Sequence, residues 1–295
     1  MQITSAMVKE LRERTGAGMM DCKHALQEAE GDIEAAIEAM RKSGVAKAAK
    51  KAGRIAAEGN IIIQQNPDSG GIVILEINSE TDFVAKDGNF KSFGDNVATC
   101  ILANRPADVE KLMTLPIQKG SNQTVEETRQ QLVTKIGENI SIRRFTLVQN
   151  KGARFGTYLH GTRIGVIVSM QGGDDTLAKD IAMHIAASKP VCVAEENVSS
   201  DLIKKEKEIL IAQAQDTGKP PEIIEKMIGG RLNKFLQEIT LLGQPFVKDT
   251  DQTVGKLLGK ADAKVNHFIR YEVGEGLEKR TDNFAEEVMA QVRGV

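Results

Sequence analysis

One arrangement of strands and helices occurs twice in this 295-residue sequence, and it constrains the fold more than any other feature. An apolar run rich in β-branched residues, GIVILEIN, starts at Gly71, and a similar run, GVIVSMQG, starts at Gly165. A helical pattern follows each run, and each copy closes with a strand-like segment, SIRRFTL from Ser141 and FIRYEVG from Phe268. Hairpin signals precede both runs. The duplication therefore predicts an α+β fold whose core is two related subdomains of antiparallel sheet and helix.

An insertion delays the closing strand of the second copy. Residues 199–214 have the pattern of a charged amphipathic helix, and the turn signal DTGKPP then starts a second helix that reaches Ile239. Two helices joined by so tight a connection form an antiparallel hairpin. We therefore expect a helical hairpin that protrudes from the second subdomain.

The first 54 residues have the pattern of three short helices, of which the third ends near Gly44. Helices this short must pack on one another, so we expect a small bundle. The stretch that follows, residues 45–54, is basic and rich in alanine, which predicts a helical tail that leads into a linker. Contact with nucleic acid is the alternative for this stretch, but no stacking aromatic residue accompanies it.

The segment SETDFVAKDGNF joins the strand of the first copy to the following helix, which Asp87 is suited to cap. Its Thr81, Asp82, Phe83 and Val84 place a carboxylate and an aromatic ring side by side on a connection, where binding groups are often presented. Alternatively, Phe83 turns into the core beneath the helix. The second copy has DDTL at this position. A ring needed only for packing would tend to recur in both copies, so the single aromatic favours a special role for Phe83.

Two further places could present binding groups. The adjacent Met19 and Met20 follow a TGAG turn, and they are either gap fillers inside the bundle or a soft contact surface. His160 lies in YLHGTR, at a glycine-flanked hairpin tip. His184, by contrast, falls inside a predicted helix and is expected to be structural.

The sequence lacks the patterns of common catalytic and metal sites. No complete phosphate loop, GxGxxG, HExxH or GxSxG motif is present, and the three cysteines are far apart. We therefore expect no enzyme, no catalytic residue, no metal site and no cofactor. The formal net charge of −2 gives no overall attraction to nucleic acid, and no apolar run approaches the ~20 residues that span a membrane. A helical start without a signal-peptide pattern and unpaired cysteines predict a cytoplasmic protein.

Seven segments carry a more specific signal. They are LRERTGAGMMDCKHAL from Leu11, EINSETDFVAKDGNF from Glu76, KIGENISIRR from Lys135, HGTRIGV from His160, MHIAASKP from Met183, LLGQPFV from Leu241 and FIRYEVGEG from Phe268. In this order they closely resemble the elongation factor Ts family, the guanine-nucleotide exchange factors of elongation factor Tu in bacterial translation. The resemblance covers essentially the whole chain, although residues 104–123 match nothing distinctive.

The resemblance implies a ubiquitin-associated-like three-helix domain at the N-terminus, a duplicated core, a protruding helical hairpin and a C-terminal helical module. The corresponding boundaries are 1–54 for the first domain with its basic linker, 55–141 for the first core subdomain, 142–192 and 242–276 for the second, 193–241 for the hairpin and 277–295 for the C-terminal module.

The resemblance also implies a function, which is to bind the GDP form of elongation factor Tu and to accelerate GDP release so that GTP can rebind. It places the segment 81–84 beside the partner's Mg²⁺ site, the hairpin tip at His160 against another domain of the partner, and the N-terminal bundle against its nucleotide domain. The residues so implicated are Thr81, Asp82, Phe83, Val84, His160, Gly161, Arg163, Met19 and Met20. No membrane or nucleic-acid partner is implied. Whether the helical hairpin joins two copies in a homodimer or a 2:2 complex is left open.

Overall fold

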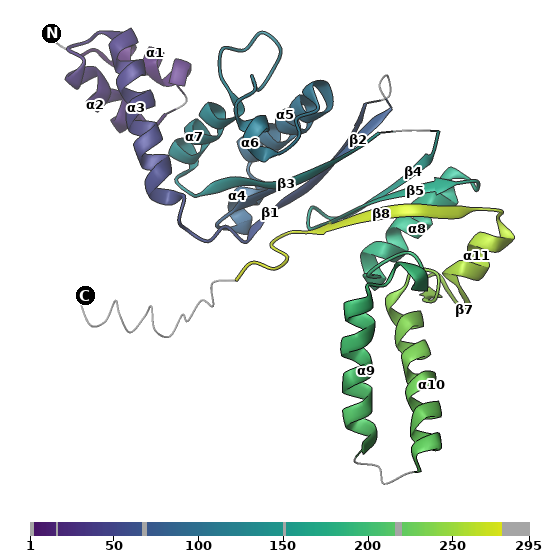
Figure 1. Cartoon of the computed structure of the whole chain (residues 1–295). Coiled ribbons are helices and arrows are strands. Elements are labelled where there is room, and N and C mark those ends of the chain that lie inside the picture. Colours follow the sequence, from purple (N-terminus) through teal and green to yellow (C-terminus); the bar gives the residue numbers. More distant parts are fainter. Residues whose placement is uncertain (1–2, 16, 67–69, 150–151, 216–219, 279–295) are drawn as a thin grey trace. The chain divides into compact units, whose positions relative to one another are not determined.

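The computed structural model describes residues 3–15, 17–66, 70–149, 152–215 and 220–278 (Figure 1). Two compact units make up the chain, one of Met1–Gln64, Leu75–Thr146 and Val273–Val295, and the other of Gln65–Ile74 and Leu147–Glu272. The described residues form a sheet of strand order β1-β2-β3 and another of order β4-β5-β8, together with helices. The predicted α+β fold is confirmed, whereas the expected C-terminal helix lies outside the described residues.

The elements follow the predicted order. In the first half of the chain they are α1 (Ser5–Thr15), α2 (Met19–Glu28), α3 (Ile33–Lys51), β1 (Glu58–Asn66), β2 (Gly71–Ser79), α4 (Asp82–Lys86), α5 (Gly88–Asn104), α6 (Val109–Met113), α7 (Val125–Ile136) and β3 (Ile140–Gln149). In the second half they are β4 (Arg154–His160), β5 (Ile164–Gln171), α8 (Asp175–Ser188), η1 (Glu195–Asn197), α9 (Ser200–Gln215), α10 (Pro221–Ile239), β6 (Pro245–Phe246), β7 (Asp249–Thr253), α11 (Val254–Lys260) and β8 (Lys264–Glu272).

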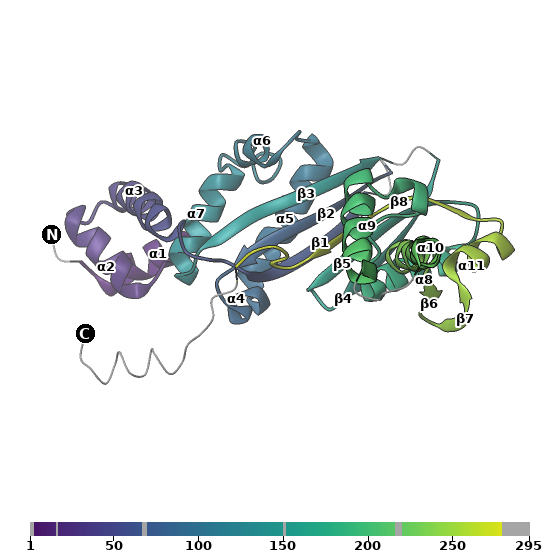
Figure 2. The same ribbon diagram turned by 60° about the horizontal axis from the view of Figure 1, so that its bottom comes forward.

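The first three helices pack on one another as a bundle (Figures 1 and 2). Its buried core consists of Leu11, Cys22, Ala25, Leu26 and Ala36. All three helices contribute side chains to this core, so none of them has to be stable alone.

The third helix of the bundle is longer than predicted. α3 does not end near Gly44 but continues to Lys51 as one helix. Gly44 lies where α3 packs against α7, since a Cβ there would come within 3.1 Å of Thr134 Oγ1. The Lys51 ammonium group donates a hydrogen bond to the carbonyl of Gly137 at the end of α7. The predicted helical tail is therefore confirmed as far as Lys51, but it continues α3 without an end near Gly44, because packing against α7 supports the helix there.

The helix after the first duplicated strand forms as predicted. β2 is buried along its whole length because it is the central strand of its sheet. The Asp87 carboxylate caps α5 by accepting hydrogen bonds from the amides of Asn89 and Phe90 at 2.8 and 3.2 Å. α5 then packs closely on the sheet at Gly94, where a Cβ would lie 2.3 Å from the Ile62 side chain.

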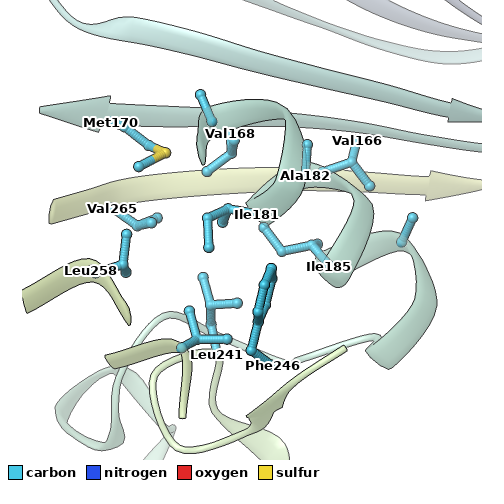
Figure 3. Packing of buried hydrophobic residues seen from close by; sticks show 13 residues of the cluster. Val166, Val168, Met170, Ile181, Ala182, Ile185, Leu241, Phe246, Leu258 and Val265 are labelled. Atoms are coloured by element: carbon cyan, nitrogen blue, oxygen red, sulfur yellow. The ribbon is translucent and has the colours of Figure 1, made fainter. Parts of the chain in front are cut away.

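The second unit has its core between the β4-β5-β8 sheet and α8 (Figure 3). β5 pairs antiparallel with both neighbours, with Ile164 opposite His160 on β4 and Val166 opposite Arg270 on β8. The core is made of Val166, Val168 and Met170 from β5, Ile181, Ala182 and Ile185 from α8, and Leu241, Phe246, Leu258 and Val265 from the chain after α10. Residues on both sides of the insertion thus build one core.

The insertion between those residues is the expected helical hairpin. α9 and α10 run side by side in opposite directions (Figure 1). Backbone hydrogen bonds close its base, from Val191 N to Ile239 O at 2.8 Å and from Leu241 N to Cys192 O at 2.9 Å. The chain therefore enters and leaves the hairpin at adjacent points of the second unit.

His184 on α8 is fully buried, as expected for a structural residue. Its Nδ1 accepts a hydrogen bond from the amide of Val247 at 3.2 Å, so its Nε2 carries the proton and donates to Gln244 Oε1 at 3.0 Å. Burial lowers the pKa of His184, because the charged imidazolium would lose its hydration. A neutral histidine thus connects α8 to the segment that follows the hairpin.

Candidate partner-binding site

Phe83 projects from the short helix α4 with 79% of its surface exposed. The same helix buries Val84 and Ala85, which are 8% and 7% exposed. The alternative in which Phe83 packs into the core is therefore wrong. An exposed phenylalanine on an otherwise anchored helix is a group that can gain free energy by being buried against another protein.

The N-terminus of α4 is held by a residue that the sequence did not single out. The Thr81 hydroxyl accepts a hydrogen bond from the amide of Val84 at 3.4 Å and donates one to Glu138 Oε1 at 2.7 Å. The Thr81 amide donates to the second carboxylate oxygen of Glu138 at 3.0 Å. The only sequence signal for Glu138 was its place in KIGENISIRR, a segment quoted for its family resemblance.

The C-terminal end of α4 is held by a buried amide on β1. Asn60 is 3% exposed, and its Nδ2 donates a hydrogen bond to the carbonyl of Ala85 at 2.7 Å. The helix is therefore fixed at both ends by side chains from distant parts of the chain. Of the predicted segment, Thr81 and Val84 serve to hold the helix, whereas Asp82 and Phe83 face solvent.

The exposed face of α4 also carries a charge pair. Lys86 Nζ lies 2.7 Å from Asp82 Oδ2, four residues earlier on the helix, and 5.9 Å from the centre of the Phe83 ring. The hydrogen bond from Lys86 lowers the pKa of Asp82, so this carboxyl group is ionised at neutral pH. Spacing by four residues was the sequence signal that could have identified Lys86.

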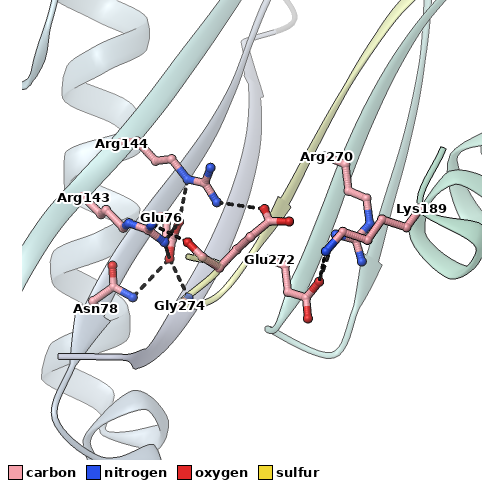
Figure 4. A network of polar contacts seen from close by, with 9 residues as sticks. Glu76, Asn78, Arg143, Arg144, Lys189, Arg270, Glu272 and Gly274 are labelled. Carbon is pink, nitrogen blue, oxygen red and sulfur yellow. Dashed lines mark hydrogen bonds and ion pairs between the residues drawn. The ribbon is translucent and has the colours of Figure 1, made fainter. Parts of the chain in front are cut away.

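A buried carboxylate anchors the strand that leads to α4. Glu76 on β2 accepts hydrogen bonds from Arg143 Nη1 at 3.0 Å, Arg144 Nε at 2.7 Å, Asn78 Nδ2 at 3.1 Å and the amide of Gly274 at 2.8 Å (Figure 4). Four donors compensate the buried charge, as burial of an ionised group requires. The network fixes β2 three residues before the strand ends at Ser79.

A separate charge cluster lies in the second unit at the end of β8. Glu272 is 3.0 Å from Arg270 Nη1 and 3.5 Å from Lys189 Nζ (Figure 4). The hydrogen bond from Arg270 lowers the pKa of Glu272.

The two methionines predicted to bind the partner lie on the first turn of α2. Met19 is 59% exposed and Met20 is 60% exposed. Interpretation of these residues as gap fillers in the bundle is therefore wrong, because the core of the bundle is filled by other side chains.

His160 is the last residue of β4, Gly161 and Arg163 lie in the turn that follows, and all three are exposed. Gly161 has φ of 58°, a left-handed conformation that favours glycine in so tight a turn. The His160 ring stacks on Tyr158 at 6.4 Å between centroids, and its Nδ1 lies 3.4 Å from the tyrosine hydroxyl. The exposed imidazole thus lies at one end of the β4–β5 hairpin, beside a tyrosine that is partly buried against the core of its unit.

The described part of the chain contains no group of three or more His, Cys, Asp and Glu side chains placed to hold a metal ion. Within the same residues, no helix combines the length and apolar character needed to cross a membrane.

Comparison with known proteins gives a consistent result along the chain. A sequence model of the family described as elongation factor TS matches residues 80–275. Elongation factor Ts of Thioalkalivibrio sulfidiphilus is 60% identical over 295 residues, which is 100% of both chains. The protein of the same name from Methylococcus capsulatus is 58% identical, and that from Legionella pneumophila (strain Paris) is 56% identical, each with 99% of both chains covered.

Proposed function

The chain belongs to the elongation factor Ts family, whose members are the nucleotide exchange factors of elongation factor Tu, and from this premise we propose how it works. It binds elongation factor Tu in the GDP form and inserts α4 beside the Mg²⁺ that holds the nucleotide. GDP then dissociates, and GTP binds in its place. The process takes place in the cytoplasm, in keeping with the free thiols of Cys22, Cys100 and Cys192.

The observation that carries this proposal is the exposed Phe83 ring on an anchored helix. A ring that is solvent-exposed in the free factor gives up few packing contacts when it enters a cleft of the partner. Removal of its apolar surface from water there favours binding. Because both ends of α4 are fixed, the Phe83 ring keeps its position on binding, and the elements of the partner that it contacts are the ones that move.

The physical basis of exchange is the dependence of bound nucleotide on Mg²⁺. In P-loop GTPases the metal neutralises phosphate charge and ties the nucleotide to the protein. A wedge that moves the metal-holding elements therefore weakens GDP binding. Coupling is reciprocal, so GDP weakens binding of the factor by the same ratio, and neither a catalytic group nor a cofactor of its own is needed.

Further contacts widen the interface. The exposed Met19 and Met20 offer flexible thioether side chains that adapt to a partner surface. The turn at His160, Gly161 and Arg163 offers an aromatic ring and a charge. In the proposal these two patches contribute binding affinity, whereas α4 displaces the elements of the partner that hold Mg²⁺.

The test is release of labelled GDP from elongation factor Tu. Phe83→Ala should abolish most of the acceleration at saturating factor, whereas Val191→Ala, which trims a side chain that is 62% exposed on the second unit, should leave it unchanged. Chelating Mg²⁺ should raise the spontaneous rate and shrink the acceleration by the wild-type factor. Full acceleration by Phe83→Ala, or acceleration that is indifferent to Mg²⁺, would rule out the wedge.

A further inference from the structure

The short helix that presents Phe83 cannot be stable by itself. α4 consists of only five residues, Asp82–Lys86, whereas isolated helices of fewer than roughly 12 residues are marginal in water. The Phe83 ring does not stabilise the helix by burial, because it is 79% exposed. The conformation of α4 must therefore come from contacts with the rest of the chain.

The strongest polar contact at the start of α4 comes from Glu138. Its two carboxylate oxygens accept from the Thr81 hydroxyl at 2.7 Å and from the Thr81 amide at 3.0 Å. Both are charge-assisted hydrogen bonds, which are stronger than bonds between neutral groups. Together they fix the residue that caps α4.

The geometry around Glu138 is reciprocal. While Glu138 binds the backbone at Thr81, Glu80 Oε1 accepts a hydrogen bond from the amide of Asn139 at 2.6 Å. Each segment thus contributes a carboxylate to the other's backbone. Gly137, with φ of 92°, makes the turn that ends α7 immediately before Glu138. The end of α7 and the start of α4 are joined by this pair of contacts.

We infer that Glu138 is a positioning residue for nucleotide exchange, which keeps α4 preformed so that Phe83 is presented in one orientation. This inference rests on the proposed function. An interface group that is already ordered loses less conformational entropy on binding than one that must be ordered by the partner. Glu138 would therefore act on exchange through Phe83, without touching the partner itself.

The first test needs only the free factor. Glu138→Gln keeps the side-chain shape but replaces one charged acceptor oxygen by a donor amide, so both charge-assisted hydrogen bonds to Thr81 are lost. Hydrogen exchange at the amides of Ala85 and Asp87, which bond within this turn, should become roughly tenfold faster. Glu110→Gln removes an exposed carboxylate on α6 and should leave exchange at these amides unchanged.

The second test is a double-mutant cycle on GDP release from elongation factor Tu. Glu138→Gln should lower the maximal rate by roughly tenfold while the melting temperature changes little, and it should have no further effect in Phe83→Ala. Thr81→Val should reproduce the loss, and Thr81→Ser, which keeps the hydroxyl, should restore most of the rate.

The outcomes separate the two proposals. Unchanged hydrogen exchange in Glu138→Gln, or a loss that adds fully to that of Phe83→Ala, would overturn the positioning role while the wild-type factor still accelerates release. If the wild-type factor does not accelerate release at all, the proposed function fails, and the positioning role fails with it. Hydrogen exchange would then report only whether Glu138 holds α4.

Discussion

The amide of Gly274 donates a 2.8 Å hydrogen bond to the carboxylate of Glu76, a residue 198 positions earlier in the chain. The end of the described chain is thereby tied to the central strand of the first sheet. Arg143 and Arg144 bind the same carboxylate, so one buried charge organises three segments.

Glu76→Gln should strongly destabilise the fold, because it leaves two arginines without their buried counter-charge. We expect a loss of about 3 kcal/mol in the free energy of unfolding, at the lower end for a broken buried pair since both arginines are partly exposed. Urea titration measures it, with Glu10→Gln on the exposed face of α1 as the control. A loss no larger than that of the control would show that the network is not a stabilising element.

Phe83→Ala and Phe90→Ala should separate a binding residue from a core residue. Phe90 is fully buried on α5, so its truncation should cost roughly 3–5 kcal/mol, whereas truncation of Phe83 should cost less than about 0.5 kcal/mol. Thermal or urea unfolding of both variants checks this. A large loss of stability in Phe83→Ala would mean that any defect in exchange reflects unfolding.

The stability of the second unit should depend on pH through His184. Its pKa in the folded protein lies below the ordinary value of 6.5, so the unfolded chain binds the proton more readily in the window between the two. The free energy of unfolding should therefore be unaffected by this group above pH 6.5 and should fall as the pH drops below it.

The measurement is urea unfolding at neutral and mildly acidic pH for the wild type and for His184→Gln, which does not titrate. The stability difference between the two proteins should narrow as the pH falls. A difference that stays constant across this range would contradict the assignment of a neutral buried imidazole.

Shortening the helical hairpin should leave the rest of the second unit folded. Backbone hydrogen bonds join Val191 to Ile239 and Leu241 to Cys192 at its base, so a short glycine-serine linker in place of residues 202–235 closes a small gap. We expect a single cooperative thermal transition close to that of the full chain. Aggregation or a broadened transition would show that the hairpin is part of the core of its unit.

Local sequence determined most of the elements. The apolar, β-branched runs from Gly71 and Gly165 became β2 and β5, and Asp87 caps α5, because alternation, apolar periodicity and capping depend on neighbouring residues. The two helices of the insertion were predictable for the same reason. The repetition of the apolar strand run and its following helix in one chain was enough to predict two sheets in an α+β fold.

Tertiary structure decided which side chains are free and which are held. Nothing near Phe83 in the sequence excludes a buried ring; its exposure follows from Val84 and Ala85 facing the body of the unit. Glu138 and Thr81 are 57 positions apart, so no local pattern could pair them. Gly44 looked like a helix end but lies inside α3, because contact with α7 outweighs its poor helix propensity. Propensities act over a few residues, whereas contacts between distant segments set burial, and burial determines which groups this chain can offer to a partner.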